Sequence, residues 1–119
     1  MNFEAINLIL DEMKQLGTFK GILFSKRDGG LIAENIGKDI DYNEFAAMCA
    51  SVFESAEGLG KTFGVNKIGK IIAELGDQTI IIVECSNKTF LTFIIGKKSN
   101  VDLVFDNWDK FNKKIINAY

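Results

Sequence analysis

The sequence predicts a single α+β domain with an antiparallel sheet, and three observations lead to that prediction. Short apolar runs between tight turns predict five strands, and longer runs with apolar residues at helical spacing predict three helices. The turns between consecutive strands are too short for the crossover that a parallel pair needs, so neighbouring strands should be antiparallel. The elements expected along residues 1–119 are helix, strand, strand, helix, strand, strand, strand and helix, at about 2–16, 21–24, 31–36, 41–63, 67–75, 78–85, 88–95 and 101–116.

The first helix and the hairpin that follows it have clear sequence signals. Gly17 is expected to end the helix as its C-cap. In the hairpin, the apolar runs 21–24 and 31–36 flank the turn 26–30, and the Asp28-Gly29 pair supplies the positive φ that a tight turn needs. The apolar side of the helix is formed by Phe3, Ile6, Ile9, Leu10, Met13 and Leu16.

The second helix, expected at 41–63, carries more apolar residues than one packed face needs. Asp39 or Asp41 is the expected N-cap, and Glu44 follows Asp41 by three residues, as in a capping box. Phe53 and Ala46 lie about 80–100° from the expected sheet-facing stripe, which indicates a second neighbour for this helix. The alternative is that Phe53 reaches the domain's own core. The expected sheet-facing stripe is Phe45, Cys49, Val52, Ala56, Leu59 and Phe63.

The last three strands and the final helix complete the prediction. Gly76-Asp77 and Ser86-Asn87 are the expected turns between the strands. Residues 80–83 are continuously apolar, which predicts that the middle strand is buried on both faces. Asn100 is the expected N-cap of the final helix. The apolar positions of this helix are Val101, Val104, Phe105, Trp108, Phe111, Ile115 and Ile116.

The composition argues against nucleic-acid binding and a membrane anchor. The formal net charge is −2, and Arg27 is the only arginine. No apolar run approaches the about 20 residues of a membrane span. The chain also lacks a signal-peptide or lipidation pattern, so a cytoplasmic location is expected. Cys49 and Cys85 lie among apolar residues and are expected to be buried free thiols, because two thiols without histidine give too few ligands for a metal site.

No catalytic or cofactor-binding pattern stands out. The sequence Gly60-Lys61-Thr62 ends like a phosphate-binding loop, but Ser55 stands where that motif has its first glycine. The three residues also fall at the expected end of a helix, where the dipole is negative and repels phosphate. The chain has no histidine and therefore no imidazole base. A protein without enzymatic activity and without cofactors is expected.

Three segments together resemble the roadblock family of dynein-light-chain-like domains. They are GILFSKRDGGLIA, FAAMCASVFESAEGLGKTFG, and the block from KIGKIIAELGDQTIIIVEC through KTFLTFIIG. The resemblance covers about residues 2–116. It implies a five-stranded antiparallel sheet in the order 2-1-5-4-3, with the second helix on one face and the other two helices on the opposite face. It also implies a non-catalytic dimer that serves as a platform for small Ras-like GTPases.

The resemblance implies that the third strand is one edge of the sheet and pairs with a second copy of the chain. Independently, this strand is apolar, and an apolar edge favours such pairing. If Ile72 lies on the two-fold axis, Lys70 lies opposite Glu74 of the second copy. The residues expected at the dimer interface are Ala46, Ala50, Phe53, Ile68, Lys70, Ile71, Ile72 and Glu74. Small and polar residues on the outer side of the second helix are expected to bind the GTPase, and they are Ala47, Ser51, Glu54, Ser55 and Gly58.

Three classes of function fit these expectations. The favoured one is a homodimer, or a dimer with another roadblock chain, that regulates or scaffolds a small GTPase. Since Arg27 is the only arginine, activation would have to act by repositioning the GTPase's own residues. A dynein-light-chain-like adaptor would instead bind through an open groove or a sheet edge. A ligand-sensing domain of profilin-like or PAS-like type would need an interior cavity with polar anchors, and the expected core is almost wholly apolar.

Overall fold

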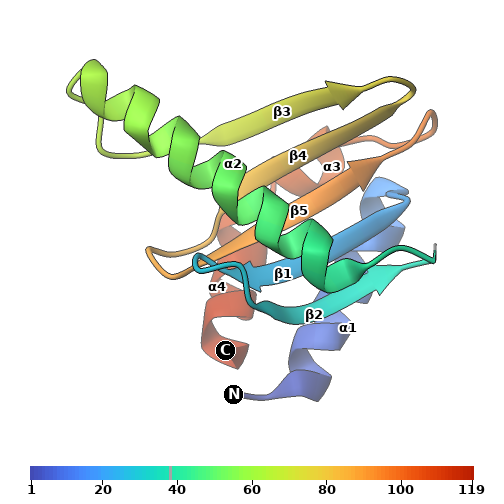
Figure 1. Ribbon diagram of the computed structural model, residues 1–119. Helices are drawn as coiled ribbons and strands as arrows, with labels where there is room; N and C mark the ends of the chain where they lie inside the picture. The colour runs from blue at the N-terminus through green and yellow to red at the C-terminus, as the bar shows by residue number, and fades with distance from the viewer. Residues whose placement is uncertain (38) are drawn as a thin grey trace.

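A computed structural model describes residues 1–37 and 39–119 and shows a sheet with helices on both faces (Figure 1). The order of the strands is β2-β1-β5-β4-β3, and every neighbouring pair is antiparallel. One helix, α2, crosses one face of the sheet, and α1, α3 and α4 lie on the other face. The predicted fold class and strand order are therefore confirmed. The elements are α1 (Phe3–Gly17), β1 (Gly21–Lys26), β2 (Leu31–Ile36), α2 (Tyr42–Thr62), β3 (Lys70–Leu75), β4 (Gln78–Glu84), β5 (Thr89–Ile95), α3 (Asp102–Phe105) and α4 (Trp108–Ala118).

The final helix is divided in two, which corrects the prediction of one continuous helix. The side-chain amide of Asn107 donates to the carbonyl of Leu103 at 3.1 Å, and this carbonyl is the acceptor that a continuous helix would give to the Asn107 backbone. The Asn107 backbone N–H bonds to Val104 instead, at 3.0 Å. The chain therefore turns between α3 and α4. Val101, rather than Asn100, precedes the first helical residue, but the Asn100 side chain accepts from the Asp102 N–H at 3.2 Å, as a capping residue does.

The end of α1 also differs from the prediction. Gly17 is still helical, and Thr18 is the cap, in the left-handed conformation with a φ of 52°. Gly17 is needed for a different reason than capping, because a Cβ there would lie 2.4 Å from the ring of Phe19. The close approach of this ring selects glycine one position before the cap.

The hairpin between β1 and β2 brings its turn against α2. Gly29 has a φ of 99°, as the Asp-Gly pair predicts. A Cβ at Gly29 would lie 3.1 Å from the Cα of Ala47, so the turn also needs glycine for close approach to the helix. On the helix side, Asp41 is the N-cap and its side chain accepts from the Glu44 N–H at 3.0 Å. The hairpin thus places Arg27, beside the turn, close to α2.

The sheet separates two apolar cores. On β4, Ile81 and Val83 belong to the core beneath α1, α3 and α4, while Ile80 and Ile82 belong to the core beneath α2. All four are buried, which confirms that this strand is covered on both faces. Cys49 and Cys85 are buried free thiols, as expected.

The two edges of the sheet are unlike each other. At the β2 edge, the side chain of Asn35 accepts from Lys14 at 3.0 Å and donates to Asp11, both of them on α1. At the β3 edge, Ile72 and Leu75 are 63% and 54% exposed. One edge is therefore fastened to a helix by polar contacts, and the other presents apolar side chains to its surroundings.

Candidate partner-binding surface

The helix α2 presents three different sides, and the first packs on the sheet. The residues buried there are Ala46, Cys49, Ala50 and Phe53, at the i, i+3, i+4, i+7 spacing of a packed face. Phe53 is fully buried and stacks on Phe90, with 5.9 Å between the ring centres. Ala46, Ala50 and Phe53 therefore belong to the chain's own core, and the expectation that they contact a second copy is corrected. Small alanines let the helix approach the sheet, and the large Phe53 fills the space beyond them.

The second side of α2 is apolar and exposed. Val52, Leu59 and Phe63 were expected to face the sheet, but they are 42%, 65% and 81% exposed. Met48 joins them and is 61% exposed. Counting about 100° per residue, these four side chains lie roughly 120° around the helix from the buried side. We call Met48, Val52, Leu59 and Phe63 the apolar stripe.

The apolar stripe continues towards the exposed edge of the sheet. A hollow of about 440 Å³ lies between the first half of α2 and the ends of β3 and β4. Phe45 and Met48 line it from the helix, and Leu75 and Ile80 line it from the sheet. Met48 belongs to both the apolar stripe and this hollow, so exposed apolar side chains connect α2 with Leu75 at the end of β3.

The residues of β3 divide between the two faces of the sheet. Ile71 lies opposite Ile82 of β4 and, with Ile68, packs partly buried against the core beneath α2. Lys70 lies on the other face, with its Nζ 4.1 Å from the centre of the Phe105 ring. Ile72 and Glu74 are exposed. All five interface residues expected in and beside β3 are therefore at or near a free edge.

The third side of α2 is polar and formed by small residues. Ala47, Ser51, Glu54, Ser55 and Gly58 lie on it, and all five are exposed. Glu54 and Gly58 line a hollow of about 380 Å³, together with Arg27, Glu57 and Lys61. The hydroxyl of Ser51 donates to the carbonyl of Ala47 at 3.3 Å, so it is already bonded within the helix.

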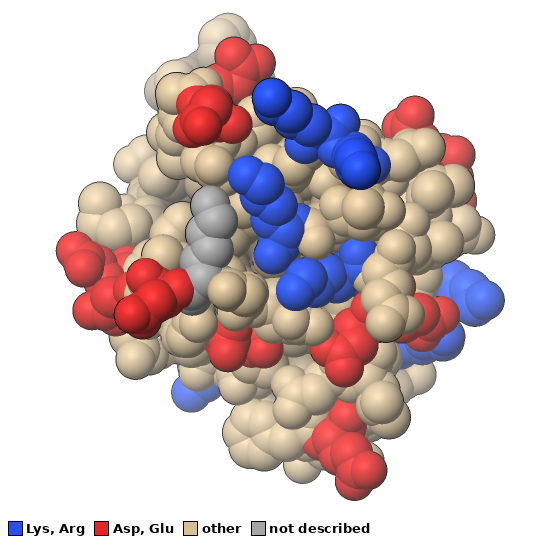
Figure 2. All heavy atoms as spheres, turned by 90° about the vertical axis from the view of Figure 1, so that its right-hand side faces the viewer, with Lys and Arg blue, Asp and Glu red and all other residues tan. Residues whose placement is uncertain are grey.

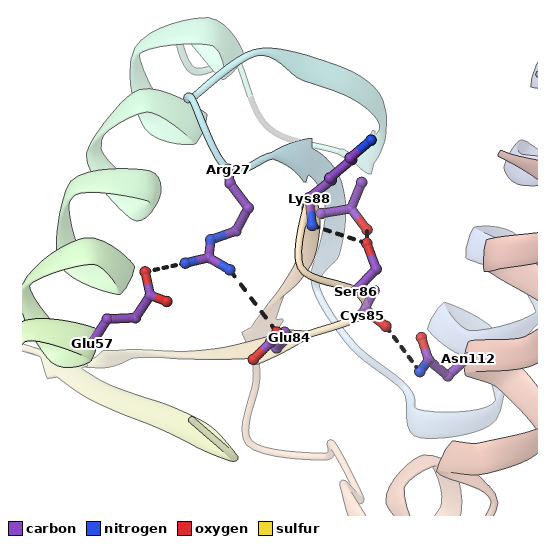
Figure 3. Close-up of polar contacts among 8 residues, drawn as sticks. Arg27, Glu57, Glu84, Cys85, Ser86, Lys88 and Asn112 are labelled. Atoms are coloured by element: carbon purple, nitrogen blue, oxygen red, sulfur yellow. Dashed lines mark hydrogen bonds and ion pairs between the residues drawn. The ribbon is translucent and has the colours of Figure 1, made fainter. Parts of the chain in front are cut away.

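Arg27 lines that hollow and contacts residues of α2 and β4. Its guanidinium donates to the carboxylate of Glu57 on α2 and lies 3.9 Å from that of Glu84 at the end of β4 (Figure 3). It also lies over Phe53, 4.1 Å from the ring centre. The side chain is four-fifths covered, so its charge is held by the protein rather than offered to a partner. Arg27 falls within the turn 26–30 that the sequence predicts, and no local pattern there predicts its contacts with α2 and β4.

The two buried thiols are poor nucleophiles. Burial raises the pKa of the Cys85 thiol, and the neighbouring charge of Glu84 raises it further. Burial also raises the pKa of Cys49. Both thiols are therefore protonated at neutral pH, and the thiolate is the nucleophile. Gly60-Lys61-Thr62 lies at the C-terminal end of α2, as predicted. Within residues 1–37 and 39–119, no cluster of metal-binding side chains and no helix able to span a membrane is found.

A comparison with protein families decides how this architecture is classified. The family model described as Roadblock/LC7 domain matches residues 5–94. The chain belongs to the Roadblock/LC7 family. The predicted family is confirmed, and the match spans both the hairpin and the candidate surface on α2 and β3.

Solved structures extend this likeness to the whole chain. MglB from Myxococcus xanthus superposes with a TM-score of 0.87 at 19% identity, covering 98% of this chain and 96% of that one. The gliding protein MglB from Thermus thermophilus gives a TM-score of 0.86 at 13% identity, covering 98% and 89%. Profilin II from Acanthamoeba castellanii gives 0.60 at 15% identity, covering 97% of each chain. Identities this low show the shared fold alone. A search of curated proteins finds no match.

Proposed function

We propose that this Roadblock/LC7 domain is a non-catalytic dimer that binds a small Ras-like GTPase and regulates or scaffolds it. The observation that carries the proposal is the apolar region that runs from the stripe on α2 to the free edge of β3. Exposing it in a monomer is unfavourable, since apolar surface gains about 25 cal/mol per Å² on burial. A two-fold axis beside β3 would cover the same patch on both copies.

The proposed dimer keeps the β3 residues of the sequence prediction. In it, β3 pairs with the same strand of a second copy. The residues that contribute to this contact in and beside β3 are Ile68, Lys70, Ile71, Ile72 and Glu74. The apolar stripe replaces Ala46, Ala50 and Phe53 as the contribution of α2, because these three are already buried. Another roadblock chain in place of the second copy would use the same region.

The GTPase is proposed to bind the polar side of α2, at Ala47, Ser51, Glu54, Ser55 and Gly58. Small side chains allow close approach and lose little rotamer entropy on binding. Glu54 is exposed and has no ion pair among the residues that the structure describes, so it is available to a basic group of the partner. Membership of the Roadblock/LC7 family and the likeness to MglB support this choice of partner.

The experiment tests the GTPase-binding surface and the dimer contact independently. The double variant Ser51→Arg, Gly58→Arg places bulk and charge on the polar side of α2. A Cβ at Gly58 meets no heavy atom within 4 Å, so the helix accepts the change. The protein is immobilised, and GTPases captured from native lysate with a GTP analogue or with GDP are identified by mass spectrometry and then purified for direct binding.

The matched control is Gln15→Arg, Asn117→Arg, which adds the same charge at exposed positions of α1 and α4. We expect the control to bind the purified GTPase as the wild type does, and the α2 variant to lose binding while light scattering still reports a dimer. Binding by the α2 variant equal to that of the control would place the GTPase elsewhere. A monomeric wild type at micromolar concentration would remove the dimer from the proposal.

A further inference from the structure

A hollow at one end of the sheet gathers three lysines and belongs to neither proposed surface. It has a volume of about 440 Å³ and lies where β5 runs into the loop 96–99, beside the start of β1. Lys20, Lys97 and Lys98 line it, together with Gly96 and Asp77. We call it the lysine hollow. Figure 2 looks at this end of the molecule, where basic side chains gather near the middle and carboxylates lie around them.

The charges in the lysine hollow are not neutralised by the protein. Asp77 is the only acidic residue among those that line it. None of the three lysines has an ion pair within residues 1–37 and 39–119, and Lys20 makes only a long contact of 3.5 Å with the amide oxygen of Gln78. In a chain with a net charge of −2, three lysines and one aspartate therefore line this hollow. Like charges that line one hollow repel one another, and an anion bound among them would relieve that repulsion.

The loop that carries two of these lysines has a fixed shape. The hydroxyl of Ser99 accepts from the Gly96 N–H at 2.9 Å and donates to the Thr18 carbonyl at 2.7 Å. The Ser99 N–H returns to the Gly96 carbonyl at 3.2 Å. These bonds close the loop and tie it to the end of α1. Lys97 and Lys98 are thus carried by a braced loop, and little backbone entropy remains to be lost when they bind.

Gly96 leaves room for the side chain of Lys20, the third lysine of the hollow. A Cβ at this position would lie 3.1 Å from Cγ and 3.2 Å from Cε of Lys20. The aliphatic stem of Lys20 therefore lies across Gly96, and this keeps its ammonium at the hollow. An alanine at this position would make the Lys20 stem shift by a few tenths of an ångström and would leave the charge of the protein unchanged.

We propose that the lysine hollow binds a phosphate group. Three ammonium groups match the charge of a phosphomonoester better than that of a single carboxylate, and lysine binds phosphate as a point charge. The group can belong to a lipid headgroup or to a soluble phosphate compound, since both offer the same oxygens. The proposal does not rest on the proposed GTPase binding, because none of these lysines lies on α2 or β3.

The first test is an NMR titration of the protein with inorganic phosphate, at constant ionic strength. We expect saturable shifts of the backbone amides at 96–98. The variant Lys20→Gln, Lys97→Gln, Lys98→Gln should weaken binding by about fivefold for each lysine removed, as for lysines near an anionic surface. The control is Lys88→Gln, Lys110→Gln, Lys113→Gln, with equal charge change at exposed positions elsewhere, and it should bind as the wild type does.

The second test uses Gly96→Ala, which alters geometry and leaves the charge unchanged. We expect it to weaken phosphate binding several-fold while the spectrum stays that of a folded protein. Because the effect is expected to act through Lys20, it should disappear when Lys20→Gln is already present. Shifts that never saturate, or an equal loss of binding in the control variant, would overturn the proposal.

Binding to lipid vesicles distinguishes a lipid headgroup from a soluble phosphate compound. Wild-type protein is sedimented with phosphatidylcholine vesicles that contain or lack phosphatidic acid. Sedimentation that depends on phosphatidic acid and on the three lysines assigns the site to lipid headgroups. Binding of inorganic phosphate without sedimentation assigns it to a soluble phosphate compound. No binding of either would refute the site and leave the GTPase proposal unaffected.

Discussion

The guanidinium of Arg27 lies 4.1 Å from the centre of the Phe53 ring and donates to Glu57 one helical turn further along α2. This relationship matters because no residue of α2 beyond Phe53 is buried. The last nine residues of α2, 54–62, extend past the apolar core and carry part of the proposed GTPase surface. Arg27 is the contact that ties their beginning to β1 and β4.

Replacing Arg27 should therefore loosen the second half of α2. We expect Arg27→Met to lower the free energy of unfolding by about 1–2 kcal/mol, because a partly covered ion pair and a cation–π contact are both lost. Urea denaturation checks this value. Arg27→Lys should recover only part of it, since an ammonium cannot lie flat on Phe53 and pair with both Glu57 and Glu84 at once. Equal stability of Arg27→Met and wild type would show that the contact does not hold the helix.

Phe53 within α2 and Phe63 at its end should respond differently to replacement by alanine. Phe53→Ala should cost about 3–5 kcal/mol, because it empties a fully buried site. Phe63 is 81% exposed, so Phe63→Ala should change the stability of an isolated copy by less than about 0.5 kcal/mol. It should nevertheless weaken the proposed dimer. Unfolding curves at low and high protein concentration distinguish the two effects, since only dimer stability depends on concentration.

The register of the proposed β3 pairing can be tested by exchanging charges. If Ile72 lies on the two-fold axis, Lys70 faces Glu74 of the second copy twice, and each pair contributes about 0.2–1 kcal/mol. Lys70→Glu should weaken association, and adding Glu74→Lys should restore it. Sedimentation equilibrium measures both. Because Lys70 also lies over Phe105, Lys70→Gln serves as the control for the loss of that contact. A double variant no tighter than Lys70→Glu would exclude this register.

The buried thiols should make the protein sensitive to alkaline pH. The folded protein raises the pKa of Cys49 and Cys85 above the usual 9.0, chiefly by burial. Stability from these groups is complete below the unfolded pKa. It is lost as the pH rises above that value, because the unfolded chain then releases protons that the folded chain keeps. In that range, each thiol lowers the free energy of unfolding by up to about 1.4 kcal/mol per pH unit.

Measurements of unfolding between neutral pH and pH about 10 should show this decline. Cys85→Ala should flatten it while lowering stability at neutral pH. Native protein should also react slowly with a thiol reagent at neutral pH, and denatured protein should react at once. An unchanged pH slope in Cys85→Ala would assign the decline to other groups.

The elements that the sequence predicted well have signals that lie close together along the chain. The Asp28-Gly29 turn, the Asp41 cap and the continuous apolar run at 80–83 each identify one local structure. The rotation of α2 could not be predicted in this way. Apolar residues occupy two of its sides, and only the packing of Phe53 against Phe90 and Arg27 decides which side faces the sheet. The break before α4 was missed for a similar reason, because it depends on where one asparagine side chain donates.

The candidate surface was predicted in outline and corrected in detail. The exposed β3 edge follows from the strand order, which the family resemblance implied. The small polar residues of α2 lie on its outer side as expected, but only Glu54 and Gly58 border a hollow. Arg27 and Glu57 complete that hollow from segments 30 residues apart, and no pattern in the sequence links them.

The unlike edges of the sheet bear on how far an assembly built on it could extend. If β3 pairs with its own copy, β2 lies at both outer ends of the enlarged sheet, and there Asn35 is bonded to α1. Head-to-tail growth would need β2 to pair with β3. The proposed dimer uses the β3 edge of both copies, so the enlarged sheet could extend further only by pairing β2 with β2.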